Sequence, residues 1–328
     1  MISPSENPLR RHAGTAKLFR VIVCILCFVG LNEIHGYDPE KATFSLKFKD
    51  AVSAYRIMSV FVLPGETITF EALGMNQKNH YEWSVPAGVI KEISSNKWNW
   101  NAPGETGLYS VKVINRESLE SMKINVFVML PYNQLKGEYI NGYRIGTYPV
   151  FPAKHVSLYQ HPKGFIEVTH ENEDTYISPH FRLKQFLCKQ GGDYPKYIVL
   201  KERLLLKLEL ILEHINQRGY RADTFHILSG YRTPYYNKLI GNVRNSRHLY
   251  GGAADIFVDE DPKDGLMDDL NKDGRINYLD AQVIYKIVDD LYGTPWYMFF
   301  AGGLGWYKKT ASHGPFVHVD VRGYRARW

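Results

Sequence analysis

The feature that most constrains this chain is a change in the spacing of its apolar residues between two regions. From about residue 42 to 130, short apolar runs alternate with turns, as in IMSVFVLPGETITFEAL, where Pro64 and Gly65 separate two runs. This pattern predicts a β-sandwich. In KERLLLKLELILEHINQRG, apolar residues recur at helical spacing up to Gly219. That spacing predicts an amphipathic helix that ends at this glycine.

The remainder of the chain mixes strands and helices without a βαβ repeat. Strands are expected in TFHILSGYRT and FVHVDV, and a helix in AQVIYKIVDDLY. The mixture predicts an α+β domain. We therefore expect an N-terminal export segment at 1–36, an all-β sandwich at 37–130, a connecting segment at 131–195, and an α+β domain at 196–328.

The N-terminus has the pattern of an export signal. Basic residues precede an apolar run from Val21 to Leu31, which matches a signal-peptide core and is short for a membrane span. Gly36 offers a small residue before a cut, but Ile34 is a poor partner for cleavage. We expect an exported protein of the periplasm or cell envelope. An uncleaved anchor that tethers the chain to the membrane is the alternative.

Charge is unevenly distributed along the chain. The formal net charge is +6, although eleven acidic and four basic residues lie between Asp255 and Asp290, so the remainder is strongly basic. A basic body favours anionic surroundings such as cell-wall polymers, lipid headgroups or nucleic acid. Because no nucleic-acid motif is present, we expect no nucleic-acid partner. Cys188 is the one cysteine outside the apolar run, so no intramolecular disulfide is expected in the mature chain.

Three residues suggest a metal site. SRHLYGGAAD places His248 before Asp255 with six residues, mostly small, between them, and FVHVDV supplies His318 on an alternating pattern. Two histidines and one carboxylate, with a position left for water, form a recurring catalytic zinc arrangement. The His248–Asp255 spacing alone fits an ordinary buried histidine and a surface aspartate equally well.

The segments SGYRT, SRHLYGGAAD and FVHVD together resemble the zinc D-Ala-D-Ala peptidase family, which is M15-like. That family shares its fold with vancomycin-resistance dipeptidases and the Hedgehog signalling domain, and the resemblance runs from about residue 200 to the end. WNAPGETGLYSV in the sandwich is similar to immunoglobulin-like and PKD-like extracellular domains. The family signature S-x-H-x-x-G-x-A-x-D is filled by Ser246, His248, Gly251, Ala253 and Asp255.

The resemblance implies a fold and a set of roles. The fold would be an α+β Hedgehog/DD-peptidase-like domain behind an immunoglobulin-like sandwich. His248, Asp255 and His318 would bind zinc. Arg232 would face the carboxylate or carbonyl of the substrate, and Ser246 would hydrogen-bond the peptide.

The chain departs from the family at the general base. The family carries Glu or Asp three residues before its last histidine, where this chain has Pro315. His313 and Asp320 remain within reach of His318. We favour His313 as the acid/base or oxyanion stabiliser, and Asp320, on the same strand face as His318, as the carboxylate that orients it.

DLNKDGRINYLD, at 269–280, has the spacing of a calcium loop. Gly274 stands where such a loop turns sharply, and a single cation would relieve the repulsion between the acids. The loop resembles those of dockerins and EF-hands, and a structural calcium site is favoured over partner binding because only one loop is present. The expected calcium ligands are Asp269, Asn271, Asp273, the Arg275 carbonyl, Asn277 and Asp280.

Three functional hypotheses follow. The first is an exported zinc D-Ala-D-Ala carboxypeptidase or endopeptidase that acts on peptidoglycan stem peptides. The second is a peptidoglycan-binding module that keeps the fold without catalysis, which Pro315 favours. In the third, the sandwich binds a wall polymer or another partner and is the part that matters for function.

Overall fold

The structure is a computed structural model that describes residues 36–74, 80–150 and 159–328. The predicted export segment, except for residue 36, lies outside these ranges. Residues 35–328 form one compact unit by their contacts. Within the described ranges, every helix is too short or too polar to cross a membrane.

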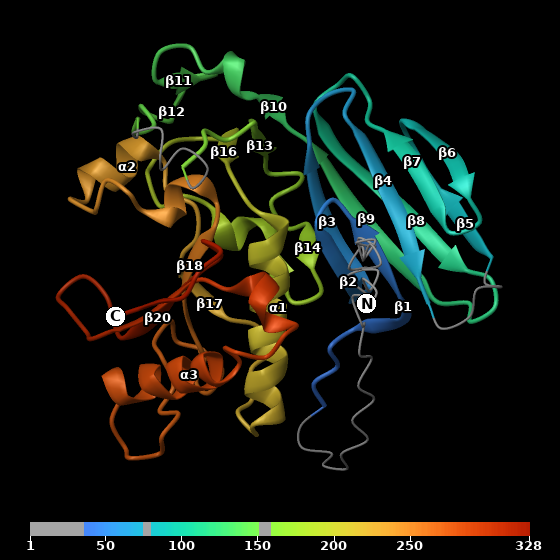
Figure 1. Ribbon diagram of the computed structural model, residues 1–328. Helices are drawn as coiled ribbons and strands as arrows, with labels where there is room; N and C mark the ends of the chain where they lie inside the picture. The colour runs from blue at the N-terminus through green and yellow to red at the C-terminus, as the bar shows by residue number, and fades with distance from the viewer. Residues whose placement is uncertain (1–35, 75–79, 151–158) are drawn as a thin grey trace, which may run out of the picture. The chain divides into compact units, whose positions relative to one another are not determined.

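The N-terminal part consists of two sheets around a shared apolar core (Figure 1). Trp98 and Trp100 from one sheet and Val111 and Ile124 from the other are buried in that core. The expected runs around Pro64 and Gly65 are two separate strands, β3 and β4. The first sheet has the order β2 (Ala51–Tyr55), β1 (Lys41–Phe48), β4 (Thr67–Leu73), β7 (Lys97–Asn101), β6 (Val89–Ser94), and the second β3 (Ile57–Val62), β9 (Ser121–Val128), β8 (Gly107–Asn115), β5 (Tyr81–Ser84).

The segment from 130 to 200 is built from short elements that pack on the C-terminal part. β13 (Gly164–Val168) pairs with β10 (Leu130–Pro131) and β16 (Lys196–Ile198). Phe165 and Tyr197 are completely buried in the same core as α1. The other elements in the described part of this segment are two small hairpins and two 3₁₀ helices: β11 (Tyr139–Ile140) with β12 (Tyr143–Arg144), β14 (Tyr176–Ser178) with β15 (Phe181–Arg182), η1 (Tyr132–Gln134) and η3 (Leu183–Phe186).

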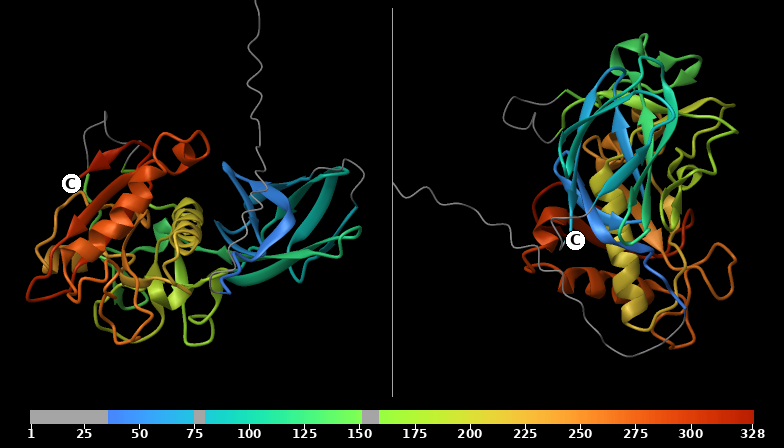
Figure 2. Two further views of the ribbon diagram at one scale, coloured as in Figure 1. Left: turned by 90° about the horizontal axis from the view of Figure 1, so that it is seen from below. Right: turned by 90° about the vertical axis from the view of Figure 1, so that its right-hand side faces the viewer.

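The C-terminal part is a five-stranded sheet with helices packed against it. α3 (Tyr278–Asp290) packs on the sheet and α1 (Glu202–Gln217) packs on α3 (Figures 1 and 2). The other helical elements are α2 (Pro234–Leu239), η4 (Arg247–Tyr250) and η5 (Tyr297–Phe300). The sheet has the order β17 (His226–Ser229), β18 (Ala253–Phe257), β20 (Phe316–Asp320), β19 (Gly303–Tyr307) and β21 (Ala326–Arg327), and its neighbours are antiparallel except for β19 and β21.

The sequence prediction for α1 is confirmed. Leu204, Leu208 and Ile211 all face the core with no exposed surface, as their spacing requires. Gly219 follows the helix with φ +85°, a left-handed conformation that glycine adopts without a steric penalty. The buried apolar face therefore stabilises the helix, and Gly219 determines where it ends.

Side chains from the sandwich contact the C-terminal part directly. Phe61 and Phe127, from β3 and β9, belong to the core that contains α1. The Lys49 ammonium lies 2.6 Å from a Glu202 carboxylate oxygen, which also accepts the Phe61 backbone N–H at 3.1 Å. The start of α1 is thereby anchored on β3.

Candidate metal centre

Two adjacent strands and one 3₁₀ helix bring together the three residues expected to bind metal. Asp255 on β18 lies directly opposite His318 on β20 in the antiparallel register. His248 comes from η4, which leads into β18. Asp255 Oδ1 lies 2.8 Å from His318 Nδ1 and 3.2 Å from His248 Nε2, and the two ring nitrogens are 3.2 Å apart.

Both imidazoles are oriented by an acceptor on the side away from Asp255. His248 Nδ1–H donates to the Gly230 carbonyl at 2.7 Å, which leaves Nε2 with its lone pair toward the group. His318 Nε2–H donates to Asp320 Oδ2 at 3.2 Å, which turns Nδ1 toward Asp255. Such outer partners fix the tautomer and the ring plane of metal-binding histidines.

Asp320 is itself held firmly. It is completely buried, and its Oδ1 accepts the Gly303 backbone N–H at 2.8 Å. Arg322 donates to both of its oxygens. Burial opposes ionisation of Asp320, but the His318 and Arg322 hydrogen bonds outweigh burial and lower its pKa. The side chain is therefore a fixed anion behind His318.

The electrostatics of the cluster favour a cation at its centre. Burial lowers the pKa of His248. Burial also opposes ionisation of Asp255, but the two imidazoles outweigh it and hold the pKa of Asp255 well below its usual range. Burial alone would lower the pKa of His318, but its hydrogen bonds to Asp255 and Asp320 produce a net rise. Either a proton or a metal ion between His318 and Asp255 would neutralise the Asp255 carboxylate. Metal binding would therefore release protons from the cluster.

The donor set fits a zinc-type ion. Among the described residues, His248, Asp255 and His318 are the one group of three His, Cys, Asp or Glu side chains whose donor atoms all lie within 4.8 Å of one another. All three side chains are buried. Two imidazole nitrogens and one carboxylate oxygen are the protein ligands typical of a catalytic zinc site with an open position.

Arg232 and Ser246 contact the residues of the cluster and line the same cleft. Arg232 Nη2 lies 2.5 Å from Asp255 Oδ2, and its Nε donates to Ser229 at 2.7 Å. Its Nη1 makes no hydrogen bond to the described residues. Ser246 Oγ accepts the His248 backbone N–H at 3.4 Å and caps η4. Arg232 thus keeps one donor for a ligand.

The cluster opens into a cleft of about 610 Å³. Asp320 lies behind His318 and does not line this cleft, and Asp255 is its only acidic side chain among the described residues. His313 Nδ1–H donates to the Gly314 carbonyl at 2.8 Å, so its Nε2 is left as an acceptor. Six of the expected site residues line the cleft: Arg232, Ser246, His248, Asp255, His313 and His318.

Trp328 and Tyr307 are among the cleft residues that were not predicted from sequence. Trp328 lies 5.4 Å from His318 between ring centroids, and its indole N–H donates to the Tyr307 hydroxyl. A methyl group at Gly303 or Gly305 of β19 would overlap the Trp328 indole. The alternating glycines of GGLGWY were the available signal, because a strand keeps such residues where a large ring packs closely.

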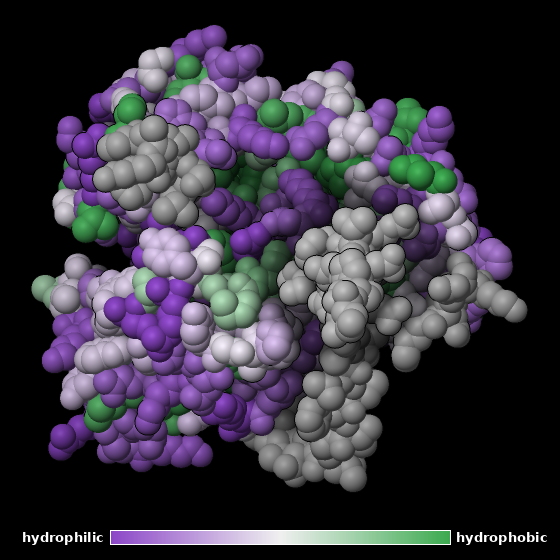
Figure 3. Space-filling view, in the orientation of Figure 1, coloured by the Kyte–Doolittle hydropathy of each residue, from purple (hydrophilic) through white to green (hydrophobic). Residues whose placement is uncertain are grey.

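The predicted calcium loop lies outside the cleft. Asp269 accepts the backbone N–H groups of Asp273 and Gly274, and the buried Asp280 accepts those of Asn271 and Asn277. The carboxylates thus serve as turn and helix-cap acceptors, and the described residues give no support for calcium, which stays a prediction. The face drawn in Figure 3 is largely hydrophilic around α3, which follows this loop.

One comparison with known proteins matches a range that overlaps this site. The peptidase M15 family model matches residues 179–279, a range that contains His248 and Asp255 and ends before His318. No curated protein matches the chain. A solved structure of a DUF4784 family protein from Bacteroides caccae is similar at 13% identity with a TM-score of 0.17, over 27% of this chain and 24% of that one, and carries no argument. The chain contains a peptidase M15 domain, which supports an activity of the metallopeptidase type.

Proposed function

We propose that this chain is an exported zinc metallopeptidase of the cell envelope that hydrolyses D-Ala-D-Ala or D,D-cross-link bonds in peptidoglycan stem peptides. The observation that carries the proposal is the convergence of His248, Asp255 and His318 at the wall of a large cleft. A zinc ion in such a site polarises a carbonyl and lowers the pKa of a bound water to about 7. The peptidoglycan substrate and the export rest on the sequence resemblance and on the N-terminal pattern.

Arg232 is positioned to bind the substrate. Two of its nitrogens hold Asp255 and Ser229, and Nη1 remains for an acceptor in the cleft. A guanidinium recognises a carboxylate or a carbonyl oxygen through directed hydrogen bonds. We assign Arg232 to the terminal carboxylate or the carbonyl of the stem peptide.

His313 is the proposed proton-transfer group. It lines the cleft, and its Nε2 is an acceptor because Nδ1–H donates to Gly314. Pro315, at the position where related peptidases carry an acid, has no side-chain group that can transfer a proton. His313 therefore replaces that acid as base, as acid or as oxyanion donor.

The test combines metal analysis with an activity assay. The full chain is purified, zinc is measured per molecule, and the protein is incubated with purified muropeptides. We expect loss of terminal D-Ala or of cross-links, abolished in His248→Ala and preserved in His226→Ala, a histidine that pairs with Asp259 outside the cleft. His313→Gln should lower kcat by about 10²-fold or more at unchanged zinc content.

A non-catalytic peptidoglycan-binding module is the second candidate. It is favoured by one observation, that among the described residues lining the cleft the single acid is the metal ligand Asp255. Stoichiometric zinc, tight muropeptide binding and no cleavage of any muropeptide would establish this function in place of hydrolysis.

A further inference from the structure

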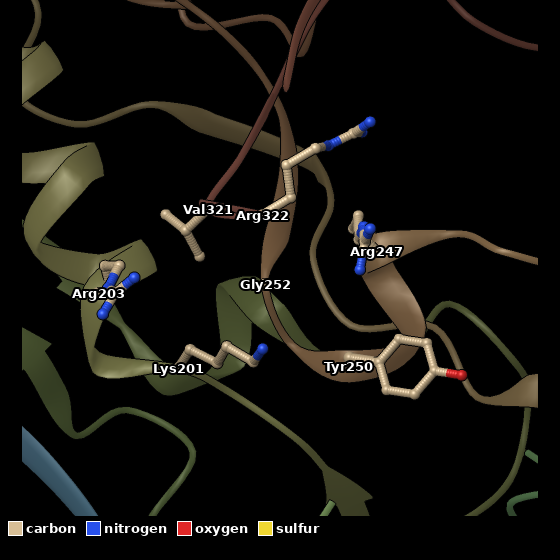
Figure 4. A pocket seen from close by; sticks show the side chains of 7 residues that line it. All are labelled: Lys201, Arg203, Arg247, Tyr250, Gly252, Val321 and Arg322. Atoms are coloured by element: carbon tan, nitrogen blue, oxygen red, sulfur yellow. The ribbon is translucent and has the colours of Figure 1, made fainter. Parts of the chain in front are cut away.

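A second cavity, of about 180 Å³, carries an unusual concentration of positive charge. Four cationic side chains line it: Lys201, Arg203, Arg247 and Arg322 (Figure 4). Lys201 immediately precedes α1, and Gly252 closes the cavity between η4 and β18. Figure 4 shows the Lys201 side chain extending beneath Gly252 toward the side where Arg247 lies.

Two of these four cationic side chains form ion pairs with acids of the protein. Arg203 pairs with Asp50, and Arg322 pairs with Asp320. The Lys201 ammonium, by contrast, makes no ion pair or hydrogen bond to any described residue. The exposed Lys201 ammonium lies within reach of the like charges of Arg247 and Arg203, which oppose its own charge, and of the acids Asp320 and Glu202, which favour it. An anion in the cavity would remove this repulsion.

The positions of Lys201 and Arg203 at the start of α1 also favour an anion in this cavity. The N-terminus of a helix carries partial positive charge and favours acidic or small polar capping residues. Here Lys201 occupies the cap position without a side-chain hydrogen bond to the helix, and Arg203 lies in the first turn. Both cations add to the positive end of the helix dipole. Glu202, also in the first turn, is the acidic residue that this end of a helix favours, so Lys201 and Arg203 are the departure from the usual pattern.

The cavity adjoins the metal cleft. Arg247 and Arg322 line both spaces. Arg247 directly precedes the ligand His248, and Arg322 follows β20, which carries His318. The two spaces therefore share a wall that is formed by these two arginines.

We propose that the Lys201 cavity is an anion subsite that binds a carboxylate of the peptide substrate at a distance from the scissile bond. This inference rests on the proposed peptidase function and adds a substrate preference to it. The Lys201 ammonium, which lines the cavity, supplies a charge-assisted donor to the carboxylate.

The test compares two peptides on the full, zinc-loaded chain. One is a stem pentapeptide with the free α-carboxylate of its D-Glu, and the other has that carboxylate amidated. Affinity is measured as Kd by calorimetry, or as KM where the peptide is cleaved. Lys201→Gln should weaken binding of the carboxylate peptide by about tenfold, as expected for loss of one charge-assisted hydrogen bond. Binding of the amidated peptide should be unchanged, and Lys201→Arg should keep the preference.

Each contrary result has a distinct meaning. Equal binding of the two peptides by the wild type, or a preference that survives in Lys201→Gln, would overturn the subsite. If inorganic phosphate binds in a Lys201-dependent way at constant ionic strength while the peptides do not differ, the cavity holds a free anion and not the substrate. If the wild type prefers the carboxylate peptide but cleaves neither, the subsite stands and the hydrolytic function fails.

Discussion

At the scale of single residues, Asp320 determines how His318 is presented to a metal. It accepts His318 Nε2–H while Gly303 and Arg322 hold it in place. Asp320→Asn keeps the shape of the side chain but removes its negative charge. A neutral amide then replaces the carboxylate that accepts His318 Nε2–H and orients the imidazole ring. Because such outer partners contribute about 10–100-fold to metal affinity, we expect zinc to bind more weakly by that factor.

The measurement is a zinc competition titration with a fluorescent chelator. Asp289→Asn is the matched control, since Asp289 also pairs with arginines but does not contact the metal cluster. Equal zinc affinities for wild type and Asp320→Asn would show that His318 is oriented by its strand alone.

A second prediction at this scale concerns the Trp328 wall of the cleft. Gly305→Ala would push a methyl group into the indole. Overpacking of this kind costs about 1–3 kcal/mol. We expect that loss in the free energy of unfolding measured with urea. The double variant Gly305→Ala/Trp328→Ala should lose less than the sum of its single variants, and simple additivity would mean that the ring is not packed there in solution.

At the scale of elements, the turn from η4 into β18 depends on the first of two adjacent glycines. Gly251 has φ +63°, and a Cβ there would overlap the Val199 carbonyl. Gly252 has no such constraint, and a Cβ there would make ordinary contacts with the Lys201 stem at 3.5 Å and the Val321 side chain at 3.6 Å. Gly251→Ala should therefore destabilise the fold by at least about 1–3 kcal/mol, the cost of a strained left-handed residue, whereas Gly252→Ala should change stability little.

Thermal unfolding of the two alanine variants provides the comparison. Since Gly251 sits between His248 and the strand that carries Asp255, the first substitution should also reduce zinc content. Equal melting temperatures for both variants would contradict the backbone clash as the reason for a glycine at 251.

The elements show which features a sequence can reveal. The helix at 202–217 was predictable because its apolar spacing and its glycine stop are local signals. The alternation of FVHVDV correctly indicated a strand, β20. The acid spacing at 269–280 also gives a strong local signal for a calcium loop, which stays a prediction, and in the structure these carboxylates accept backbone N–H groups of their own turn and helix. Composition and spacing do not distinguish an acid that binds calcium from one that accepts backbone N–H groups.

Features that depend on distant segments were beyond the sequence. Trp328 packs over glycines of β19, and Lys201 meets Arg247 and Arg322 from other parts of the chain. Neither contact leaves a periodic pattern. The long segment at 131–195 shows the same limit, because its short strands are fixed by burial of Phe165 and other side chains in the α1 core.

At the scale of the whole molecule, Lys207 couples the stability of the chain to pH. It is buried on α1, and its ammonium donates to the carbonyls of Asp320 at 2.8 Å and Phe300 at 3.1 Å. The lysine thereby joins the helix to the end of β20 and to η5. Burial lowers the pKa of Lys207 to about 7, although the Asp320 carboxylate acts in the opposite direction.

The sign of the resulting pH dependence follows from proton binding. Above pH 7 the folded chain releases the Lys207 proton, whereas the unfolded chain keeps it up to a pKa of about 10.4. The unfolded state then binds more protons, so this residue makes stability rise with pH in that window, by up to about 1.4 kcal/mol per pH unit. Below pH 7 both states are protonated, and the cost of burying the charge is fully present.

Lys207→Met tests this coupling because it keeps the length of the buried chain and removes its titration. Urea unfolding of the chelator-treated protein from pH 6.5 to 9.5 should show the wild type gaining stability relative to the variant as pH rises, with most of the change above pH 7. Lys112→Met, an exposed lysine of β8, should run parallel to the wild type throughout. Parallel curves for Lys207→Met would mean that the ammonium stays charged in the folded state, held by its two carbonyl acceptors.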